Sequence, residues 1–454
     1  MNMNTGNIID GNPTKKFFIE MITRDISIED AIIDLLDNSI DGANRLKADN
    51  YSGLSINITI NKSEFIIEDN CGGFSLETAQ KYAFRFGRPE EAPNEHNTIG
   101  RFGIGMKRSL FKMGKDFFVE TQTDADHFKI EVDVAQWSKQ QQVLTDTDGK
   151  TISVDDWNFN YQLIEGKNAQ NGTIIKVTNL HDEVSELFKT DTFLNDLAND
   201  VQKQLNFSLL KGLTITLNGR QLEGKQITML ISDEVKPYYT DGVLQDGKIK
   251  YRIVAGLGEI GNPKDSGWYI YCNNRLVVDA DTSPLTGWGV NGISKWHVAD
   301  VMFRGVIFLD AEDTINLPLT TTKKGIDATS NIYQALLPLM RQAMIQVMNF
   351  LKKIPNLKDE ANEYRTMLCE TLNSIDTMAM KAPNTFKDVK MKCFIAPPLD
   401  VDKIAQKRQS VRIAYDANKE LADYAKVHAQ LSSYKDLGLL TFNYYLQLEQ
   451  INNE

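Results

Sequence analysis

Four polar side chains near the N-terminus have the types and the spacing to bind a metal ion. In the stretch DLLDNSIDGAN they recur every three or four residues, as Asp34, Asp37, Asn38 and Asp41. At about 100° per residue they fall within about 100° of arc on one face of a helix. A carboxylate at Asp34 could orient a water molecule while the amide oxygen of Asn38, one turn further on, binds a hard cation. The pairing suits hydrolysis of a magnesium-bound phosphate, and the alternative is a solvated helix face.

A second candidate site follows an expected strand, in IIEDNCGGFS. Asp69 ends the strand, and Gly72 and Gly73 come soon after it. Glycines at this point let the backbone turn sharply and let a flat ligand approach. The carboxylate could accept a hydrogen bond from an exocyclic amine such as that of adenine, although a tight turn uses the same residue types.

A third stretch, TIGRFGIGMKRSLFKMG, places closely spaced glycines before a helix expected from about Met106. Such glycines aim backbone N–H groups and the positive end of the helix at an anion. Arg101 and Lys107 add positive charge there, and a flexible hinge is the alternative. The glycines are Gly100, Gly103 and Gly105.

Other nucleotide-binding patterns do not fit. The sequence contains no GxxxxGK[ST] stretch, which excludes a Walker P-loop, and no HRD and DFG pair of a protein kinase. The glycines do not follow a strand in the βαβ arrangement that a dinucleotide site requires.

These stretches must be positioned by an α/β layer that fills about the first 185–200 residues. Residues 14–47 are expected to form two helices, the second starting at Ser27 with a capping-box-like Asp30. LSINITINKSEFIIE alternates apolar and polar residues, as a β-hairpin does. Further strands are expected at 117–122, 127–134 and 173–179, and helices over 187–212.

A second α/β unit is expected over about residues 213–345. Its strands would be LTITLNG, YRIVAGLG and RGVIFLD, with a hairpin in GWYIYCNNRLVV around an Asn-Asn turn. A helix near 331–352 would close the unit. The following residues, about 353–454, are expected to be mostly helical.

Composition limits the classes of protein. The chain has 454 residues, which suggests two to four domains, and its net charge of −11 argues against coating nucleic acid through bulk charge. Its four cysteines lie far apart without a CxxC pair, which favours free thiols in a reducing compartment. The N-terminus has no signal-peptide pattern, and no apolar run approaches the roughly 18 residues that span a bilayer. We therefore expect a cytoplasmic protein without a membrane partner.

Taken in order, the acidic helix, the Asp69 turn, the glycine-rich helix start and Thr173 in NGTIIKV resemble the motifs of the GHKL ATPases. This superfamily contains DNA gyrase B, the ninety-kilodalton heat-shock chaperones, histidine kinases and MutL. The resemblance implies a Bergerat-type α/β sandwich that binds ATP and magnesium. It implies catalysis by Asp34, magnesium binding by Asn38, adenine contacts from Asp69, Gly73 and Thr173, and a lid on the phosphates made of Gly100, Arg101, Phe102, Gly103, Ile104, Gly105, Met106 and Lys107.

The sequence departs from the family pattern at two positions. Asp34 stands where the family has glutamate and is one methylene shorter. Because a displacement of about 1 Å can cost on the order of a hundredfold in rate, we expect slow hydrolysis, or a role shared with Asp37. Cys71 stands where the family's DxGxG motif has its first glycine.

The second unit resembles the ribosomal-protein-like transducer domain of MORC-type and MutL-type ATPases, and the chain looks like a prokaryotic member. The similar stretches are GWYIYCNNRLVV and KWHVADVMFRGVIFLD. The resemblance implies that a lysine of the loop TTTKKGID contacts the γ-phosphate of ATP. Lys323 is the candidate, with Lys324 as the alternative, and a basic turn exposed to solvent is the other interpretation.

The sequence thus predicts an ATP-driven molecular switch with slow ATPase activity, which forms a homodimer on binding magnesium-ATP. One candidate output is a clamp that acts on DNA in genome maintenance or antiviral defence. The other is a chaperone-like or scaffold protein that acts on protein clients and uses ATP as a conformational signal with little or no turnover. The expected parts are a dimerisation segment at 1–26, an ATP-binding domain at 27–200, a transducer domain at 201–350 and a mostly helical region at 351–454.

Overall fold

The computed structural model describes most of the chain. The described residues are 11, 13–47, 50–87, 103–145, 151–232, 235–258, 263–320, 325–352, 377–379, 392–395 and 413–449. The chain divides into two compact units, Met1–Pro397 and Pro398–Glu454. The first unit contains both of the α/β layers that the sequence predicts.

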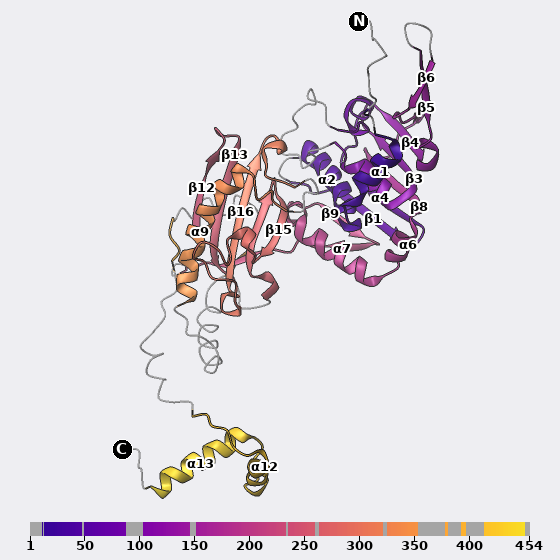
Figure 1. Ribbon diagram of the computed structural model, residues 1–454. Coiled ribbons are helices and arrows are strands. Elements are labelled where there is room, and N and C mark those ends of the chain that lie inside the picture. The colour runs from indigo at the N-terminus through magenta and orange to yellow at the C-terminus, as the bar shows by residue number, and fades with distance from the viewer. Residues whose placement is uncertain are drawn as a thin grey trace. The chain divides into compact units, whose positions relative to one another are not determined.

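A mixed eight-stranded sheet organises the first layer, in the order β10-β9-β1-β2-β8-β3-β4-β7 (Figure 1). The predicted hairpin of β1 and β2 is confirmed, and β8 pairs antiparallel with both β2 and β3. A separate two-stranded sheet joins β5 (Gln141–Thr145) to β6 (Thr151–Asp155). The strands of the large sheet are β1 (Ser55–Asn61), β2 (Glu64–Asp69), β3 (Gly114–Gln122), β4 (His127–Asp133), β7 (Tyr161–Leu163), β8 (Gly172–Leu180), β9 (Thr214–Leu217) and β10 (Arg220–Leu222).

Helices pack against this sheet and complete the predicted α/β sandwich (Figure 1). Ser27 caps the second helix, α2, because its side chain accepts a hydrogen bond of 3.1 Å from the backbone N–H of Asp30. The helices are α1 (Lys15–Arg24), α2 (Ile28–Leu46), α3 (Leu76–Thr78), the π-helix η1 (Ala79–Ala83), α4 (Gly105–Met113), α5 (Val134–Trp137), α6 (Asp182–Leu187), α7 (Asp191–Gln204) and α8 (Asn206–Leu210).

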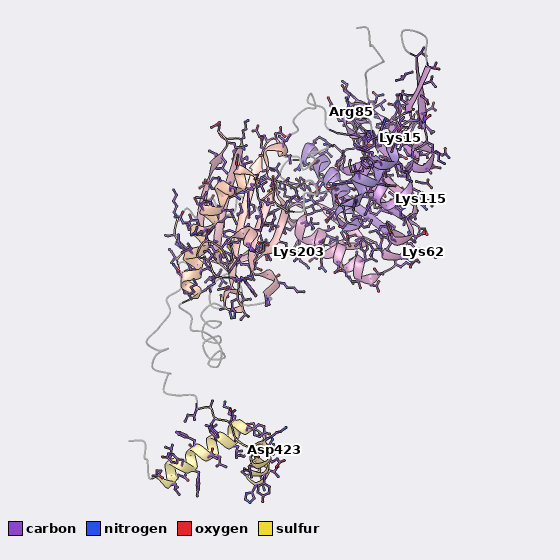
Figure 2. The ribbon with its side chains drawn as sticks, viewed as in Figure 1. Lys15, Lys62, Arg85, Lys115, Lys203 and Asp423 are labelled. Carbon is purple, nitrogen blue, oxygen red and sulfur yellow. The ribbon has the colours of Figure 1, made fainter. Side chains whose placement is uncertain are left out.

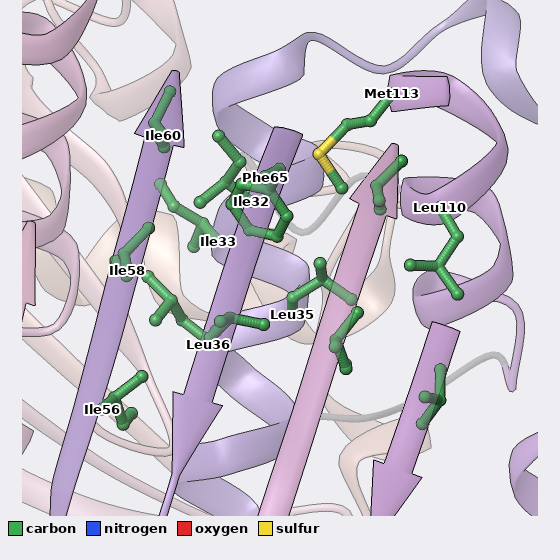
Figure 3. Packing of buried hydrophobic residues seen from close by; sticks show 14 of the residues in the cluster. Ile32, Ile33, Leu35, Leu36, Ile56, Ile58, Ile60, Phe65, Leu110 and Met113 are labelled. Carbon is green, nitrogen blue, oxygen red and sulfur yellow. The ribbon is translucent and has the colours of Figure 1, made fainter. Parts of the chain in front are cut away.

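The core of this layer lies between α2, α4 and the sheet (Figure 3). The apolar face of α2 is buried and meets the inward side chains of β1 and β2. Burying each large aliphatic side chain stabilises the fold by about 1.5–3 kcal/mol, so this contact fixes α2 on the sheet. The side chains in the contact include Ile32, Leu35 and Leu36 of α2, Ile56, Ile58 and Phe65 of the strands, and Leu110 and Met113 of α4.

One strand belongs to a different layer from the one we expected. LTITLNG was expected to open the second unit, but β9 pairs in parallel with β1, and β10 continues the same sheet. The alternating pattern predicts a strand correctly, yet it carries no information on the strand's partner. The large sheet therefore extends to Leu222, beyond the boundary at residue 200.

The second α/β layer also lies within the first compact unit and is called the second domain below. It is a five-stranded sheet, in the order β12-β13-β16-β14-β15, on which helix α9 packs (Figure 1). The predicted hairpin is confirmed as β14 and β15, and its two turn residues, Asn273 and Asn274, have positive φ angles of 46° and 67°. Both angles suit a type I′ turn. The elements are β12 (Tyr238–Leu244), β13 (Ile249–Leu257), β14 (Gly267–Cys272), β15 (Arg275–Asp281), β16 (Phe303–Ala311) and α9 (Asn331–Leu351).

The second compact unit is helical in its described part, with α12 (Lys419–His428) followed by α13 (Tyr434–Leu448). In the region before it, β17 (Thr377–Ala379) pairs with β11 (Thr228–Leu230). Throughout the described part of the chain, each helix is too short or too polar to cross a membrane.

Candidate functional site

The acidic face of α2 is buried, which contradicts the alternative of a solvated helix face. Asp34, Asp37 and Asp41 have exposed fractions of 2%, 0% and 6%. Asn38, in the middle of the same stripe, is exposed. Three carboxylates on one buried face require positive charge or hydrogen-bond donors nearby, because an uncompensated buried charge is strongly destabilising.

Two arginines from distant parts of the chain face these carboxylates. Arg108 of α4 places Nη2 2.5 Å from Oδ2 of Asp34. Arg275, the first residue of β15, donates a hydrogen bond through Nη1 to Oδ2 of Asp37, and the same nitrogen lies 4.0 Å from Oδ1 of Asp34. Both arginines are buried. The charges of Asp34 and Asp37 are therefore balanced by the protein itself.

Asp69 lies at the end of β2, and two donors hold its carboxylate. Ser39 of α2 donates a hydrogen bond of 2.6 Å to it, and the backbone N–H of Cys71 donates one of 2.9 Å. Thr173 lies opposite Asp69 in the β2–β8 pairing, and its backbone favours the charged form of this carboxylate. Burial raises the pKa of Asp69, and these hydrogen bonds oppose the rise. The expected adenine contacts Asp69 and Thr173 thus lie together.

Gly73 is required by its surroundings. Its φ angle is +63°, and a Cβ atom at this position would lie 2.2 Å from the carbonyl oxygen of Gln122. The positive φ favours glycine, and the close approach leaves no room for a Cβ atom without a backbone shift. A cavity of about 480 Å³ opens beside this turn, within the size range of ligand pockets. It is lined by Leu46, Asn70, Gly72, Thr123, Asp124, Ala125, Gln170 and Asn171.

The glycine-rich helix start approaches the acidic face of α2. Helix α4 begins at Gly105, and a Cβ atom there would lie 3.3 Å from Oδ2 of Asp34. The positive end of α4 thus faces the carboxylate, which favours negative charge at that point. Gly103, Ile104 and Met106 adjoin Gly105 in the described residues. Four of the expected site residues lie outside the described part of the chain: Gly100, Arg101, Phe102 and Lys323.

Lys107 is placed differently from the phosphate contact expected of it. Its Nζ donates to the carbonyl oxygens of Ala83, Arg85 and Gly103, at 2.7, 2.6 and 2.5 Å. These carbonyls lie on both sides of residues 88–102, so Lys107 joins the two ends of that segment. Burial lowers the pKa of Lys107 to about 7. Because all three hydrogens of the ammonium group are used, a phosphate contact would require the loss of one of these bonds.

The oxygen donors on the acidic face of α2 suit a magnesium ion that also binds the phosphates of a nucleotide. They suit a metal ion bound by protein side chains alone less well. Among the described residues, no three His, Cys, Asp or Glu side chains converge on a point that could hold a metal ion. Magnesium commonly takes one or two protein oxygens, with water and phosphate oxygens as its other ligands. The amide oxygen of Asn38, which is exposed beside the buried carboxylates, is a donor that could serve as such a ligand.

Sequence reasoning missed Ser39, Arg108 and Arg275. Arg108 follows Lys107 in the glycine-rich stretch and could have been considered with it. Ser39 lies inside the acidic stretch, but its bond to Asp69 spans 30 residues. Arg275 carries no local signal, because it follows a turn in another domain, 238 residues from Asp37.

Comparison with known protein families agrees with this geometry. Residues 26–167 match the family described as histidine kinase-, DNA gyrase B-, and HSP90-like ATPase. The chain therefore carries an ATPase domain of the GHKL superfamily, as its motifs predicted. The match supports ATP binding and a general ATPase function, and it covers Asn38, Asp69 and Gly73 but not Thr173 or Arg275. No curated protein matches the chain significantly.

Proposed function

We propose that the chain is a magnesium-ATP-dependent molecular switch that hydrolyses ATP slowly. One observation carries the proposal: Ser39 hydrogen-bonds to Asp69 across 2.6 Å. Helix α2 thus holds the candidate adenine acceptor with one residue, while its neighbour Asn38 is exposed beside the buried carboxylates. Adjoining positions of α2 thus support the candidate base-reading carboxylate and provide the candidate cation ligand, which suits the two ends of one nucleotide.

In this proposal Asp69 accepts a hydrogen bond from the adenine amine, with Gly73 and Thr173 beside the base. Asn38 is the protein ligand of magnesium, which when bound neutralises charge on the phosphates. The segment from Gly100 to Met106 supplies backbone N–H groups for the phosphates, and Lys323 contacts the γ-phosphate. Because Lys107 already joins the two ends of residues 88–102, its role is to hold the base of this segment.

Slow turnover follows from the state of Asp34. In hydrolysis, a water oxygen attacks the γ-phosphorus, the bond to the ADP oxygen breaks, and the water loses a proton to a base. A base must lie within hydrogen-bond reach of that water. The Asp34 carboxylate is held by Arg108 at 2.5 Å and is buried, so it must exchange this partner before it can act.

We further propose that magnesium-ATP drives formation of a homodimer through the N-terminal segment. Helix α1 exposes two large apolar side chains one turn apart, Phe17 and Met21, with exposed fractions of 58% and 49%. Sedimentation velocity with magnesium and a non-hydrolysable ATP analogue tests this step. A nucleotide-dependent shift from monomer to dimer is expected. A monomer in both states, under conditions where the analogue is bound, would contradict it.

Two outputs fit such a switch, a clamp on DNA and a scaffold for protein clients. A DNA-binding assay over a range of salt concentrations, with and without the same analogue, separates them. Binding that appears with the analogue and weakens with salt identifies a DNA clamp, since phosphate contacts release counterions. Absence of a DNA shift in both states would contradict the DNA clamp.

A further inference from the structure

Arg275 is held rigidly at the tip of the β14–β15 hairpin. The preceding turn residue, Asn273, is buried, and its side chain donates to the carbonyl of Ala311 and accepts from the N–H of the same residue, both at 3.0 Å. Its backbone N–H also donates to the carbonyl of Leu309 at 2.9 Å. The tip is thus fixed to the end of β16, and any movement of the second domain's sheet moves Arg275.

The hairpin tip meets helix α2 in a closely packed contact. Arg275 donates to Asp37, whose exposed fraction is 0%. The remaining space at this contact is a cavity of about 10 Å³, at the lower limit for a single water molecule. It is lined from both sides, by Ile40, Asn44, Tyr51, Leu205, Phe207, Ser208 and Lys211 of the first layer and by Asn273, Asn274 and Arg275 of the hairpin.

The ion pairs connect three elements. Arg108 ties α4 to Asp34, Arg275 ties the hairpin to Asp37, and Nη1 of Arg275 lies 4.0 Å from Oδ1 of Asp34. Asp34 and Asp37 are one helical turn apart, so both arginines act on the same face of α2. A displacement of α4 that releases Asp34 therefore changes the charge that Arg275 faces. Breaking either pair leaves a buried charge without its partner, which makes intermediate arrangements unfavourable.

The geometry points to Arg275 as a positioning residue that couples the second domain to the nucleotide-site helix α2. The coupling rests on the proposed function, since magnesium-ATP would be the signal that moves α4 and α2. A second ion pair between the same two regions provides a matched control. Lys203 of α7 (labelled in Figure 2) lies 2.6 Å from Asp279 of β15, and both side chains are over one third exposed.

The test compares the wild type with the double variant Asp37→Leu/Arg275→Met. Replacing both partners of a buried pair by apolar residues is often neutral for stability, so this variant should fold where either single variant could fail. Asp37→Asn/Arg275→Gln is a second variant, which keeps a neutral polar pair. Lys203→Met/Asp279→Leu is the control. Each protein is tested for binding of a fluorescent ATP analogue with magnesium, for ATP turnover, and for hydrogen exchange of residues 267–281.

In the wild type, binding of magnesium and a non-hydrolysable analogue should change the exchange protection of residues 267–281. In both Asp37/Arg275 variants, this change should be lost and kcat should fall by about tenfold or more, while the affinity for the analogue stays within about threefold. The control should behave as the wild type. If the Asp37–Arg275 pair had a purely structural role, its variants would lose stability and affinity for the analogue together, and kcat would not fall on its own.

Two results would overturn the coupling. One is a wild type that binds the analogue without any change in residues 267–281. The other is a folded Asp37/Arg275 variant that keeps the nucleotide-dependent change. A wild type that binds no nucleotide would instead overturn the proposed function, and the coupling with it.

Discussion

Nη2 of Arg108 lies 2.5 Å from Oδ2 of Asp34, and both side chains are buried between α4 and α2. The carboxylate that the family motif assigns to catalysis is therefore engaged by the helix that follows the glycine-rich segment. The hydrogen bond orients the carboxylate, and Oδ2 would have to leave Arg108 before it could accept a hydrogen bond from a water molecule. The chain's own arginine thus occupies the carboxylate that we propose as the catalytic base.

Replacing only one residue of the Arg108–Asp34 pair should lower the free energy of unfolding strongly. We expect Arg108→Met to destabilise the fold by about 3–5 kcal/mol, because the buried carboxylate of Asp34 loses its nearest cation. The double variant Arg108→Met/Asp34→Leu should recover most of this loss. Thermal and denaturant unfolding of the single and double variants measure both effects.

The exposed pair Glu77–Lys81 serves as the control, because its two side chains are largely solvated. Substitution of Lys81 by Met should leave the unfolding midpoint essentially unchanged. If Arg108→Met were as mild as Lys81→Met, the buried pair would have no structural importance.

Asp69 should select the base of the nucleotide. Asp69→Asn is expected to weaken ATP binding by about 10- to 150-fold, corresponding to about 1.5–3 kcal/mol for a hydrogen bond to a charged group. The affinity for GTP, which lacks the adenine amine, should change much less. Competition binding with both nucleotides measures the ratio.

Ser39→Ala provides a graded comparison for Asp69, since it removes one donor to the carboxylate and leaves the carboxylate in place. We expect a smaller loss of ATP affinity, of about three- to tenfold. Equal weakening of ATP and GTP in Asp69→Asn would show that Asp69 supports the fold without reading the base.

Lys107 should make stability depend on pH. Burial lowers its pKa from 10.5 to about 7, so between these values the unfolded chain binds more protons than the folded chain. The free energy of unfolding should therefore rise with pH across this window, and the cost of burying the charged amine is fully present below pH 7. Lys107→Met should lose this pH dependence. Denaturant unfolding at a series of pH values measures it.

The exposed Lys115 on β3 provides the control for that series (Figure 2). Lys115→Met should give a stability profile parallel to that of the wild type. The same parallel profile for Lys107→Met would contradict the prediction and would mean that the three carbonyl oxygens, which favour the charged amine, outweigh its burial.

Local patterns in the sequence predicted the elements well. The apolar stripe of α2, its cap at Ser27 and the Asn-Asn hairpin turn all depend on residues close in sequence, and all are present. The pairing of β9 with β1 and the burial of Asp34 and Asp37 could not be predicted in the same way. They depend on partners about 160, 74 and 238 residues away, which local periodicity does not contain.

For the motif residues too, the sequence alone did not predict every contact between distant parts of the chain. The resemblance to the GHKL motifs implied that Asp69 and Thr173 belong to one site, and the β2–β8 pairing brings them together. The charge of Lys107 suggested a phosphate ligand. In the structure its Nζ instead donates hydrogen bonds to the carbonyl oxygens of Ala83 and Gly103, and so connects two backbone segments. Residue type thus indicated the right region of the molecule, but the hydrogen-bond partners decide the role of each side chain.

The central claim is that α2 and the Asp69 turn bind magnesium-ATP. Isothermal titration calorimetry of the wild type and Asn38→Ala, with magnesium and with EDTA, tests it most directly, and Asn57→Ala on the exposed side of β1 is the control. The wild type and Asn57→Ala should bind ATP more tightly with magnesium, and Asn38→Ala should lose about 10- to 100-fold in affinity, with magnesium only. Magnesium-dependent binding of equal strength in Asn38→Ala and the wild type, or no binding by either, would contradict the account.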